Sequence, residues 1–407
     1  MESSTKHSTE EYKDRKFAST LISSAYAIRL LRGLSSGWLG PLIPTIALIQ
    51  GLSLVKTAFM FSVYFCGLLI MLLVGPMVLS RLGGKNCMVA AALCYATGFV
   101  TIALASGAYM LWLGALFVGL GAGLSIPCGT LCVIRLSGSN PGSALSKYAT
   151  LYGIGALIGP LIAFGAMATS ISYSTVYLAG ALCALAIGYV LYSLKDRLVI
   201  KDESGKSERD KLIREPHIWG FALLLFFYVG IESSAAAWLF VYLKESCLLE
   251  ESFASFGMTA LWTGLTLGRL TAIKLCKHYS SLTIIVGALT LAATCLSLLL
   301  ASPELPVLAL SLVFVLGLGF GPVFPNIIAA GTSKYPSSIG TVTSIMMLIG
   351  VPGGILFPWL TGMMGQGNQM HATIAMLFLM TITIATTILA TGKVGSEGVL
   401  KLIRQGR

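Results

Sequence analysis

Gly119-Leu-Gly-Ala-Gly-Leu-Ser-Ile-Pro127 recurs 198 residues later in the chain as Gly317-Leu-Gly-Phe-Gly-Pro-Val-Phe-Pro325. The same shift relates two other segments, Gly155 and Pro160 to Gly353 and Pro358, and Ser35-Ser36 to Ser233-Ser234. Three separate segments agree on one register, so the chain contains an internal repeat. The repeat decides the fold, because each half is expected to form the same set of elements.

The composition around these segments is that of a membrane protein. Of 407 residues, 56% are hydrophobic and only 11% are charged, whereas about a quarter are charged in soluble domains. A helix crosses the bilayer core in about 20 mostly apolar residues. Twelve uncharged or nearly uncharged runs have the required length, at 18–44, 57–80, 87–107, 110–134, 148–170, 174–194, 218–243, 254–276, 282–302, 306–330, 339–364 and 371–391. The sequence therefore predicts an all-α polytopic membrane protein with 12 transmembrane helices.

The shift of 198 residues spans six of these helices and so preserves their direction across the membrane. The two halves are expected to be parallel repeats, related by an axis along the membrane normal. The predicted organisation is a tail at 1–17, a six-helix bundle at 18–194, a hydrophilic linker at 195–217, a second six-helix bundle at 218–391 and a tail at 392–407. Such a duplication is typical of transporters whose halves rock around a central substrate. The alternative is a duplicated bundle that only builds a large helical protein.

Basic residues are distributed unevenly between the two sides of the predicted topology. The side that holds both tails and the linker carries 22 Lys and Arg, and the other side carries two, Lys56 and Lys244. Cytoplasmic loops are the ones enriched in Lys and Arg. Both termini and the linker are therefore predicted to be cytoplasmic in an integral membrane protein. The formal net charge of +11 reflects this topology and gives no support to a nucleic-acid partner.

The loop after the second span, Gly75-Pro-Met-Val-Leu-Ser-Arg-Leu-Gly-Gly-Lys85, resembles the signature of the major facilitator superfamily (MFS). The resemblance covers nearly the whole chain and implies the MFS fold and transport by alternating access. Ser80 stands where the family usually has Asp, so Arg81 lacks the carboxylate that in the family helps to lock one conformation; Arg81 remains a gating candidate. Ala115 stands where members often have an Arg with a proton-coupling role, so that role is not expected here.

Segments of the second half are similar to one branch of the superfamily, the fucose, glucose and galactose permeases. They are Tyr228-Val-Gly-Ile-Glu-Ser-Ser-Ala-Ala-Ala-Trp238 in the seventh span, Gly264-Leu-Thr-Leu-Gly-Arg269 in the eighth, and the run from Gly317 to Pro325. This resemblance implies an alternative function, that of a proton-coupled sugar permease.

Four ionisable side chains fall inside predicted spans: Arg29 and Arg32 in the first, Glu232 in the seventh and Arg269 in the eighth. Each is costly in hydrocarbon unless it faces water, a partner or a substrate, so all four are functional candidates. Arg269 lies near the predicted cytoplasmic end of its span, where it either contacts the headgroups and the helix end or takes part in gating.

Arg29 and Arg32 lie at about mid-depth and share a helix face with Ser36. Guanidinium groups suit carboxylate or phosphate, so the pair predicts an anion site. The shift of 198 carries Leu34 onto Glu232, which places Glu232 at nearly the level of Arg32. Two accounts remain open and are not exclusive. One is a buried Arg–Glu pair that bridges the halves in one conformational state; the other is an anion-binding arginine pair with Glu232 as a proton or gating switch.

Polar and aromatic side chains of several spans are further candidates to line the central substrate cavity expected between the two bundles: Tyr26, Tyr64, Tyr152, Trp238 and Asn326. For any of the aromatic residues, packing in the core or in an interfacial belt is the competing role. Asn326 is the one Asn within a predicted span, and an unpaired amide in lipid is costly, which favours a polar contact there.

The leading hypothesis is a secondary transporter that moves a small organic anion by alternating access through a central site between the two bundles. Arg29 and Arg32 would bind the anionic group, and Glu232 would couple or gate transport. The expected partners are the solute, the lipid bilayer and a coupling ion such as H+. The alternatives are the sugar permease and a non-transporting receptor or scaffold.

An enzyme is not expected, and neither is a cofactor or a metal. Intramembrane metal hydrolysis needs clustered His and carboxylate ligands, yet the four His lie in tails, loops or span ends, at His7, His217, His278 and His371. The chain also lacks a phosphate-binding Gly-Lys-Ser/Thr loop, so ATP-driven pumping has no support. Nine cysteines are scattered mostly within spans and are interpreted as small packing residues without a disulfide framework.

Overall fold

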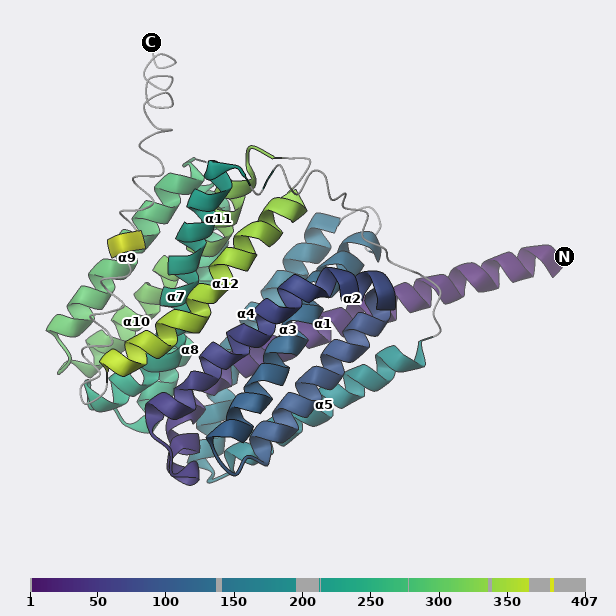
Figure 1. Ribbon diagram of the computed structural model, residues 1–407. Coiled ribbons are helices and arrows are strands. Elements are labelled where there is room, and N and C mark those ends of the chain that lie inside the picture. The colour runs from purple at the N-terminus through teal and green to yellow at the C-terminus, as the bar shows by residue number, and fades with distance from the viewer. Residues whose placement is uncertain are drawn as a thin grey trace, which may run out of the picture. The chain divides into compact units, whose positions relative to one another are not determined.

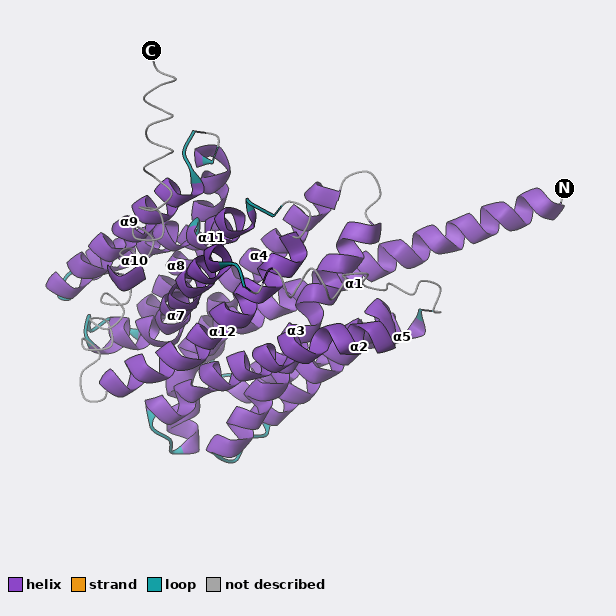
Figure 2. Ribbon diagram, turned by 45° about the horizontal axis from the view of Figure 1, so that its top comes forward, coloured by secondary structure: helices purple, strands orange, loops and turns teal. Residues whose placement is uncertain are grey.

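The computed structural model describes residues 2–136, 141–194, 212, 214–276, 278–335, 339–365 and 381–383 of the chain. Within these ranges every regular element is an α-helix, and no strand is present (Figure 2). The chain divides into two compact units, Met1–Glu203 and Ser204–Arg407, and the boundary falls within the predicted linker. The prediction of an all-α fold is confirmed.

The first unit contains five described helices, α1 (Glu2–Gln50), α2 (Leu54–Ala103), α3 (Ala108–Leu136), α4 (Pro141–Ala168) and α5 (Tyr173–Ser193). Helix α1 extends beyond the first predicted span at both ends. Helix α2 contains the second and third predicted spans, separated by a kink at Gly83, where φ is 75° and ψ is 163°. This conformation is essentially restricted to glycine, so Gly83 allows the chain to reverse between the two spans.

The second unit contains six described helices, α7 (Pro216–Glu245), α8 (Glu251–Leu275), α9 (Ser281–Ala301), α10 (Pro306–Phe320), α11 (Val323–Thr332) and α12 (Ile339–Met364). The tenth predicted span is therefore broken into α10 and α11 at Gly321 and Pro322, because proline has no N–H to continue the helix. The Tyr228 hydroxyl donates to the Phe320 carbonyl at 2.9 Å, so this backbone acceptor beside the break has a hydrogen-bond partner. Apart from 381–383, the twelfth predicted span lies outside the described residues.

Helix packing follows the internal repeat within each unit (Figure 1). In the first unit α1 packs on α4 and α2 packs on α3. In the second unit the elements that the 198-residue shift relates to these pack in the same way, α7 on α12 and α10 on both α8 and α9. The repeat seen in the sequence thus sets which helices are neighbours.

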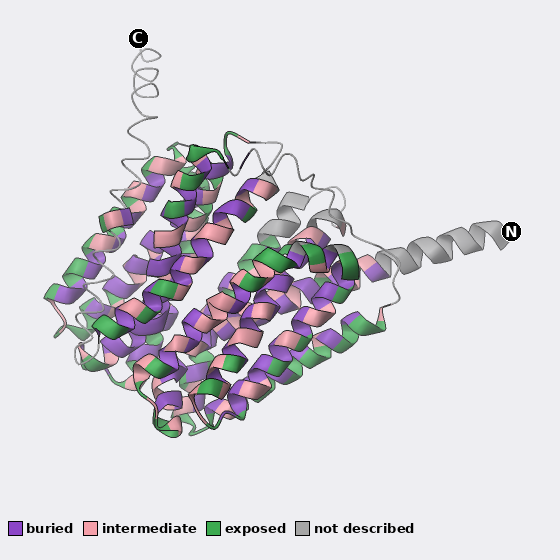
Figure 3. Cartoon of the chain, viewed as in Figure 1, coloured by how far each residue is buried: buried purple, intermediate pink, exposed green. Residues whose placement is uncertain are grey.

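The described part of the chain contains nine candidate membrane spans by length and apolar composition. Helices α1 and α8 fall outside this set, and they carry Arg29, Arg32 and Arg269. The helices bury one side and expose another (Figure 3). On α5, for example, the exposed side includes Leu182, which is 68% exposed. Apolar side chains on the outside are what a lipid environment requires.

Candidate functional site

The candidate site is built on a close crossing of α1 and α4. A Cβ atom placed on Gly33 would overlap the backbone carbonyl oxygen of Tyr152, and one placed on Gly155 would overlap that of Leu30. Small residues of this kind let membrane helices approach backbone to backbone. The crossing therefore brings the arginines of α1 next to the aromatic side chains of α4.

Five side chains meet at this level, and we call them the Arg–Tyr cluster: Arg29, Arg32, Tyr64, Tyr148 and Tyr152. The Cζ atom of Arg29 lies 4.8 Å from the centroid of the Tyr148 ring and 5.2 Å from that of Tyr152. The Cζ atom of Arg32 lies 4.8 Å from the centroid of the Tyr152 ring, so both guanidinium groups share one ring. Each such contact stabilises a desolvated cation by about 2 kcal/mol.

The two guanidinium groups differ in their hydrogen bonds. The Nε of Arg32 donates to the hydroxyl of Tyr64 at 3.2 Å. The Nε of Arg29 is buried and has no hydrogen-bond partner among the described residues. A ring face does not replace a hydrogen-bond acceptor, and a buried donor without an acceptor costs about 1–3 kcal/mol, or more when it is charged. Arg29 thus presents an unsatisfied N–H edge.

No acidic side chain of the first bundle neutralises these arginines. The sequence contains no Asp or Glu between Arg15 and Lys195. Both arginines are half-buried, and within the described residues neither forms an ion pair. The Cβ atoms of residues three apart on a helix lie about 6 Å from each other, and two unit charges at that distance repel by about 3 kcal/mol at an effective dielectric constant of about 20. An anion with several oxygen acceptors would complete such a site.

The remaining two intramembrane charges lie together in the second unit. The Oε1 atom of Glu232 on α7 lies 4.0 Å from the Nη2 atom of Arg269 on α8. The two side chains are 20% and 31% exposed. Glu232, which the sequence suggested as a partner for Arg32, therefore has a partner within its own unit. The sequence did not predict this ion pair with Arg269.

Two further predicted residues lie on α1. The ring centroid of Tyr26 is 6.3 Å from that of Tyr148, which places Tyr26 beside the Arg–Tyr cluster. Ser36 is half-buried and makes no hydrogen bond within the described residues. The preceding Ser35 instead donates to the carbonyl of Arg32 at 2.9 Å. A substrate contact by Ser36 stays a prediction.

Trp238 and Asn326 lie in the second unit, and the polar groups of both are already hydrogen-bonded. The indole N–H of Trp238 donates to the carbonyl of Pro358 at 2.8 Å. The amide of Asn326 donates to the carbonyl of Pro322 at 2.8 Å, and its Oδ1 accepts from the Cys276 thiol at 3.4 Å. The cost of an unpaired amide therefore no longer argues for a substrate contact at Asn326. Roles of both residues in substrate binding stay predictions.

Sequence reasoning missed two contributors to the first unit. Tyr148 lies four residues before Tyr152 and so on the same helix face, a spacing that could have identified it. Lys85 is 8% exposed, and its Nζ donates to the carbonyl of Leu194 at 2.7 Å, just past the end of α5. A cation is favourable there because the last carbonyls of a helix lack intrahelical partners.

Arg81 is exposed, and its gating role stays a prediction.

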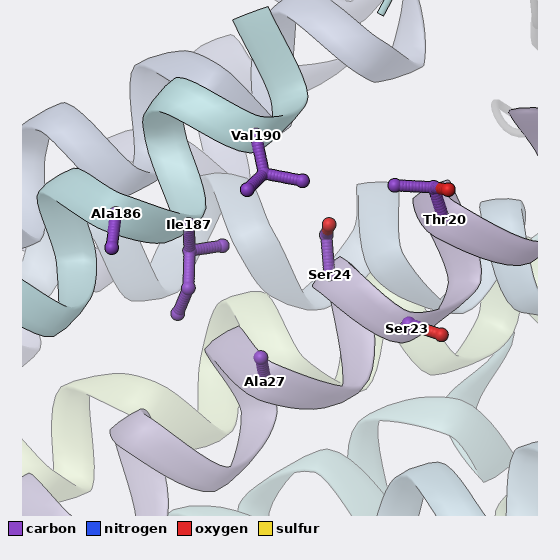
Figure 4. Close-up of a pocket in the computed structure, with 7 residues that line it drawn as sticks. All are labelled: Thr20, Ser23, Ser24, Ala27, Ala186, Ile187 and Val190. Carbon is purple, nitrogen blue, oxygen red and sulfur yellow. The ribbon is translucent and has the colours of Figure 1, made fainter. Parts of the chain in front are cut away.

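A separate groove of about 280 Å³ lies between α1 and α5 (Figure 4). Its lining consists of small polar and apolar side chains: Thr20, Ser23, Ser24, Ala27, Ala186, Ile187 and Val190. The lining includes no charged residue and no member of the Arg–Tyr cluster. The groove therefore lacks the chemistry needed to hold an anion.

All nine cysteines are free thiols in the structure. Cys247, which lies in the connection between α7 and α8, is 3% exposed. Burial raises its pKa to about 11, so this thiol stays protonated near neutral pH. Within the described residues, no group of three or more His, Cys, Asp or Glu side chains could hold a metal ion.

Comparison with known families gives one match over most of the chain. The model of the family described as Major Facilitator Superfamily matches residues 25–358. Among curated proteins, the chain is similar to "Bypass of stop codon protein 6" of Saccharomyces cerevisiae, with 29% identity over 168 residues. This similarity covers 38% of the chain and only 33% of the length of the yeast protein.

Solved structures share the fold. The D-xylose–proton symporter has a TM-score of 0.76 at 13% identity, covering 92% of this chain and 97% of that one. The fucose:proton symporter of E. coli has a TM-score of 0.61 at 16% identity, covering 91% and 98%. At these identities the likeness concerns the arrangement of helices alone.

Proposed function

The chain belongs to the major facilitator superfamily, so it is an integral membrane transporter rather than an enzyme, and we propose that it moves a small organic anion by alternating access. One observation carries the anion assignment. The Nε of Arg29 is buried without a hydrogen-bond partner, in a bundle whose sequence between Arg15 and Lys195 contains no Asp or Glu. A carboxylate or phosphate oxygen would satisfy that N–H and offset the repulsion between the two guanidinium groups.

The residues of the Arg–Tyr cluster have distinct proposed roles. Arg29 binds oxygens of the anionic group through its unpaired edge. Arg32 supplies the second positive charge, and the hydroxyl of Tyr64 fixes its orientation through the 3.2 Å hydrogen bond. The Tyr152 ring holds both guanidinium groups side by side. Because the ring contacts already restrict both guanidinium groups, little side-chain entropy is lost when the anion binds.

Uptake into proteoliposomes tests this function. Purified protein is reconstituted, and labelled organic anions are compared with neutral sugars. Arg29→Gln and Arg32→Gln should each reduce anion uptake at low concentration by at least about 30-fold, because losing one partner of a desolvated charge contact costs 2 kcal/mol or more. Lys274→Gln, which removes an exposed charge at the end of α8, is the matched control and should retain uptake. Uptake of neutral sugars alone, unaffected by the arginine substitutions, would contradict the proposal.

For Glu232 we propose a coupling role through its ion pair with Arg269. Protonation of the carboxylate removes its negative charge, so the 4.0 Å pair is weakened and α7 and α8 are freer to move relative to each other. Glu232→Gln should abolish proton-driven uptake while exchange of labelled for unlabelled substrate persists. If proton-driven uptake survives in this variant, the coupling ion acts elsewhere.

The sugar permease is the second candidate, and it shares the same coupling pair. It differs in the role of the arginines, which would then be structural. Arg32→Ala would leave sugar uptake intact under that alternative, whereas uptake of an anion would be lost under the leading proposal. Counterflow of any labelled solute would exclude a non-transporting receptor or scaffold.

For the orientation we propose that both termini and the linker face the cytoplasm. The imbalance of 22 basic residues on one predicted side against two on the other supports this placement. A protease site inserted after Ser204 should be cleaved only in inside-out or permeabilised vesicles. Cleavage from outside intact cells would overturn the orientation.

A further inference from the structure

The charges inside the predicted spans do not cancel. Glu232 is the one carboxylate in those spans, and it lies 4.0 Å from Arg269 within the second unit. Arg29 and Arg32 lie in a bundle that has no acidic residue between Arg15 and Lys195. Once the pair in the second unit is counted, two positive charges remain, and both belong to the Arg–Tyr cluster.

The cluster also restricts how a ligand reaches these charges. Tyr148 and Tyr152 lie against Arg29, and Tyr152 lies against Arg32, so aromatic rings take up space beside both guanidinium groups. The Nε of Arg32 is taken by the Tyr64 hydroxyl. What remains is the Nε edge of Arg29, which suits two oxygens of one oxyanion, and the terminal N–H groups of Arg32.

The two charges are close together. Arg29 and Arg32 are three residues apart on α1, so their Cβ atoms are separated by about 5–6 Å. Both guanidinium groups also contact the same Tyr152 ring. A ligand that neutralises both must therefore place two negative charges within a comparable distance.

We propose that the Arg–Tyr cluster binds a compact dianion, that is, a doubly charged oxyanion such as a phosphate monoester or a short dicarboxylate. This inference rests on the proposed transport of organic anions and narrows it to one substrate class. A monoanion would leave one guanidinium group without a counter-charge, and a neutral sugar would leave both.

Ligand pairs that differ by one charge test the proposal. Full-length protein in detergent is titrated at pH 7.5, and binding is read as the rise in unfolding temperature. Ethyl phosphate is compared with diethyl phosphate, and succinate with monomethyl succinate. The dianion should bind at least tenfold more tightly than its monoanion in one or both pairs. The pair with the larger ratio identifies the phosphate monoester or the dicarboxylate as the group recognised.

Arg32→Gln separates a charge role from a structural one. With one positive charge left, the dianion and the monoanion of each pair should bind with affinities within about threefold of each other. A structural role would weaken both ligands equally and keep the ratio of the unaltered protein. Lys274→Gln should keep both the affinities and the ratio.

Two other outcomes are decisive. Equal binding of dianion and monoanion by the unaltered protein overturns the dianion inference and leaves transport of organic anions intact. Binding of neutral sugars with no response to any anion overturns both.

Discussion

Arg29→Met is expected to stabilise the ligand-free protein although, under the proposed function, it should abolish anion uptake. The substitution loses two ring contacts, at 4.8 and 5.2 Å, each worth about 2 kcal/mol. It removes two destabilising contributions. The repulsion between Arg29 and Arg32 is about 3 kcal/mol, and the cost of holding a guanidinium group in the membrane interior is about 3 kcal/mol. No hydrogen bond of the Arg29 Nε is lost, because that atom has no partner among the described residues. The free energy of unfolding should therefore rise by about 2 kcal/mol.

Arg269→Met provides the matched control, because it makes the same chemical change at a paired arginine. Breaking a buried ion pair costs about 3–5 kcal/mol, and the 20% and 31% exposure of these side chains reduces this to about 1–2 kcal/mol. Thermal unfolding of both variants in detergent, followed by tryptophan fluorescence without ligand, should give shifts of opposite sign. Equal destabilisation of both variants would show that Arg29 is neutralised within the protein and would contradict an uncompensated charge at this position.

Three further predictions concern the scaffold. Gly33→Ala places a methyl group against the backbone of the facing helix. It should lower uptake, and it should lower the free energy of unfolding by about 1–3 kcal/mol. The control Gly165→Ala is on the same pair of helices with open space around it, and it should be neutral or stabilising in the same thermal unfolding assay. Lys85→Met removes a charge-assisted hydrogen bond of 2.7 Å and should lower the unfolding temperature, corresponding to about 1–2 kcal/mol; an unchanged temperature would contradict a capping role. Burial raises the pKa of Cys247 to about 11, and the thiolate is the reactive form, so alkylation measured by mass spectrometry should be slow at pH 8 and rise about tenfold per pH unit up to about pH 11; fast alkylation at pH 8 would argue against a buried thiol.

Much of the fold follows from the sequence, because apolar length and the repeat constrain the helices independently. Two details did not follow. The sequence predicted a loop between the second and third spans, but hydropathy does not show that the chain reverses at one residue, Gly83, where φ is 75°. The break at Pro322 is stabilised by the hydroxyl of Tyr228, 94 residues earlier in the sequence and on another helix. A hydropathy pattern contains neither signal.

For the candidate site, the sequence identifies charged residues within spans but not the side chains that contact them. Charge within an apolar span identifies Arg29 and Arg32, and the structure brings Tyr64 and Tyr152 to them. The pairing of Glu232 with Arg269 was missed, because counting residues along a helix gives the depth of the Cα atom. A long Arg side chain carries its charge well away from that depth.

In the two units the close helix crossing is repeated, whereas the charged positions for which we propose functional roles are not. The close crossing is repeated, since Gly155 packs against the carbonyl of Leu30 and Gly353 against that of Phe226. The cluster is not repeated, because the 198-residue shift relates its members to residues without charge: Arg29 to Phe227, Arg32 to Gly230, Tyr64 to Trp262, Tyr148 to Met346 and Tyr152 to Gly350. Conversely, Glu232 and Arg269 correspond to Leu34 and Met71. One unit therefore holds an uncompensated pair of cations and the other a neutral ion pair. Under the proposed roles, substrate charge and the coupling ion are recognised by different halves, and a substitution in one half should change one property without the other.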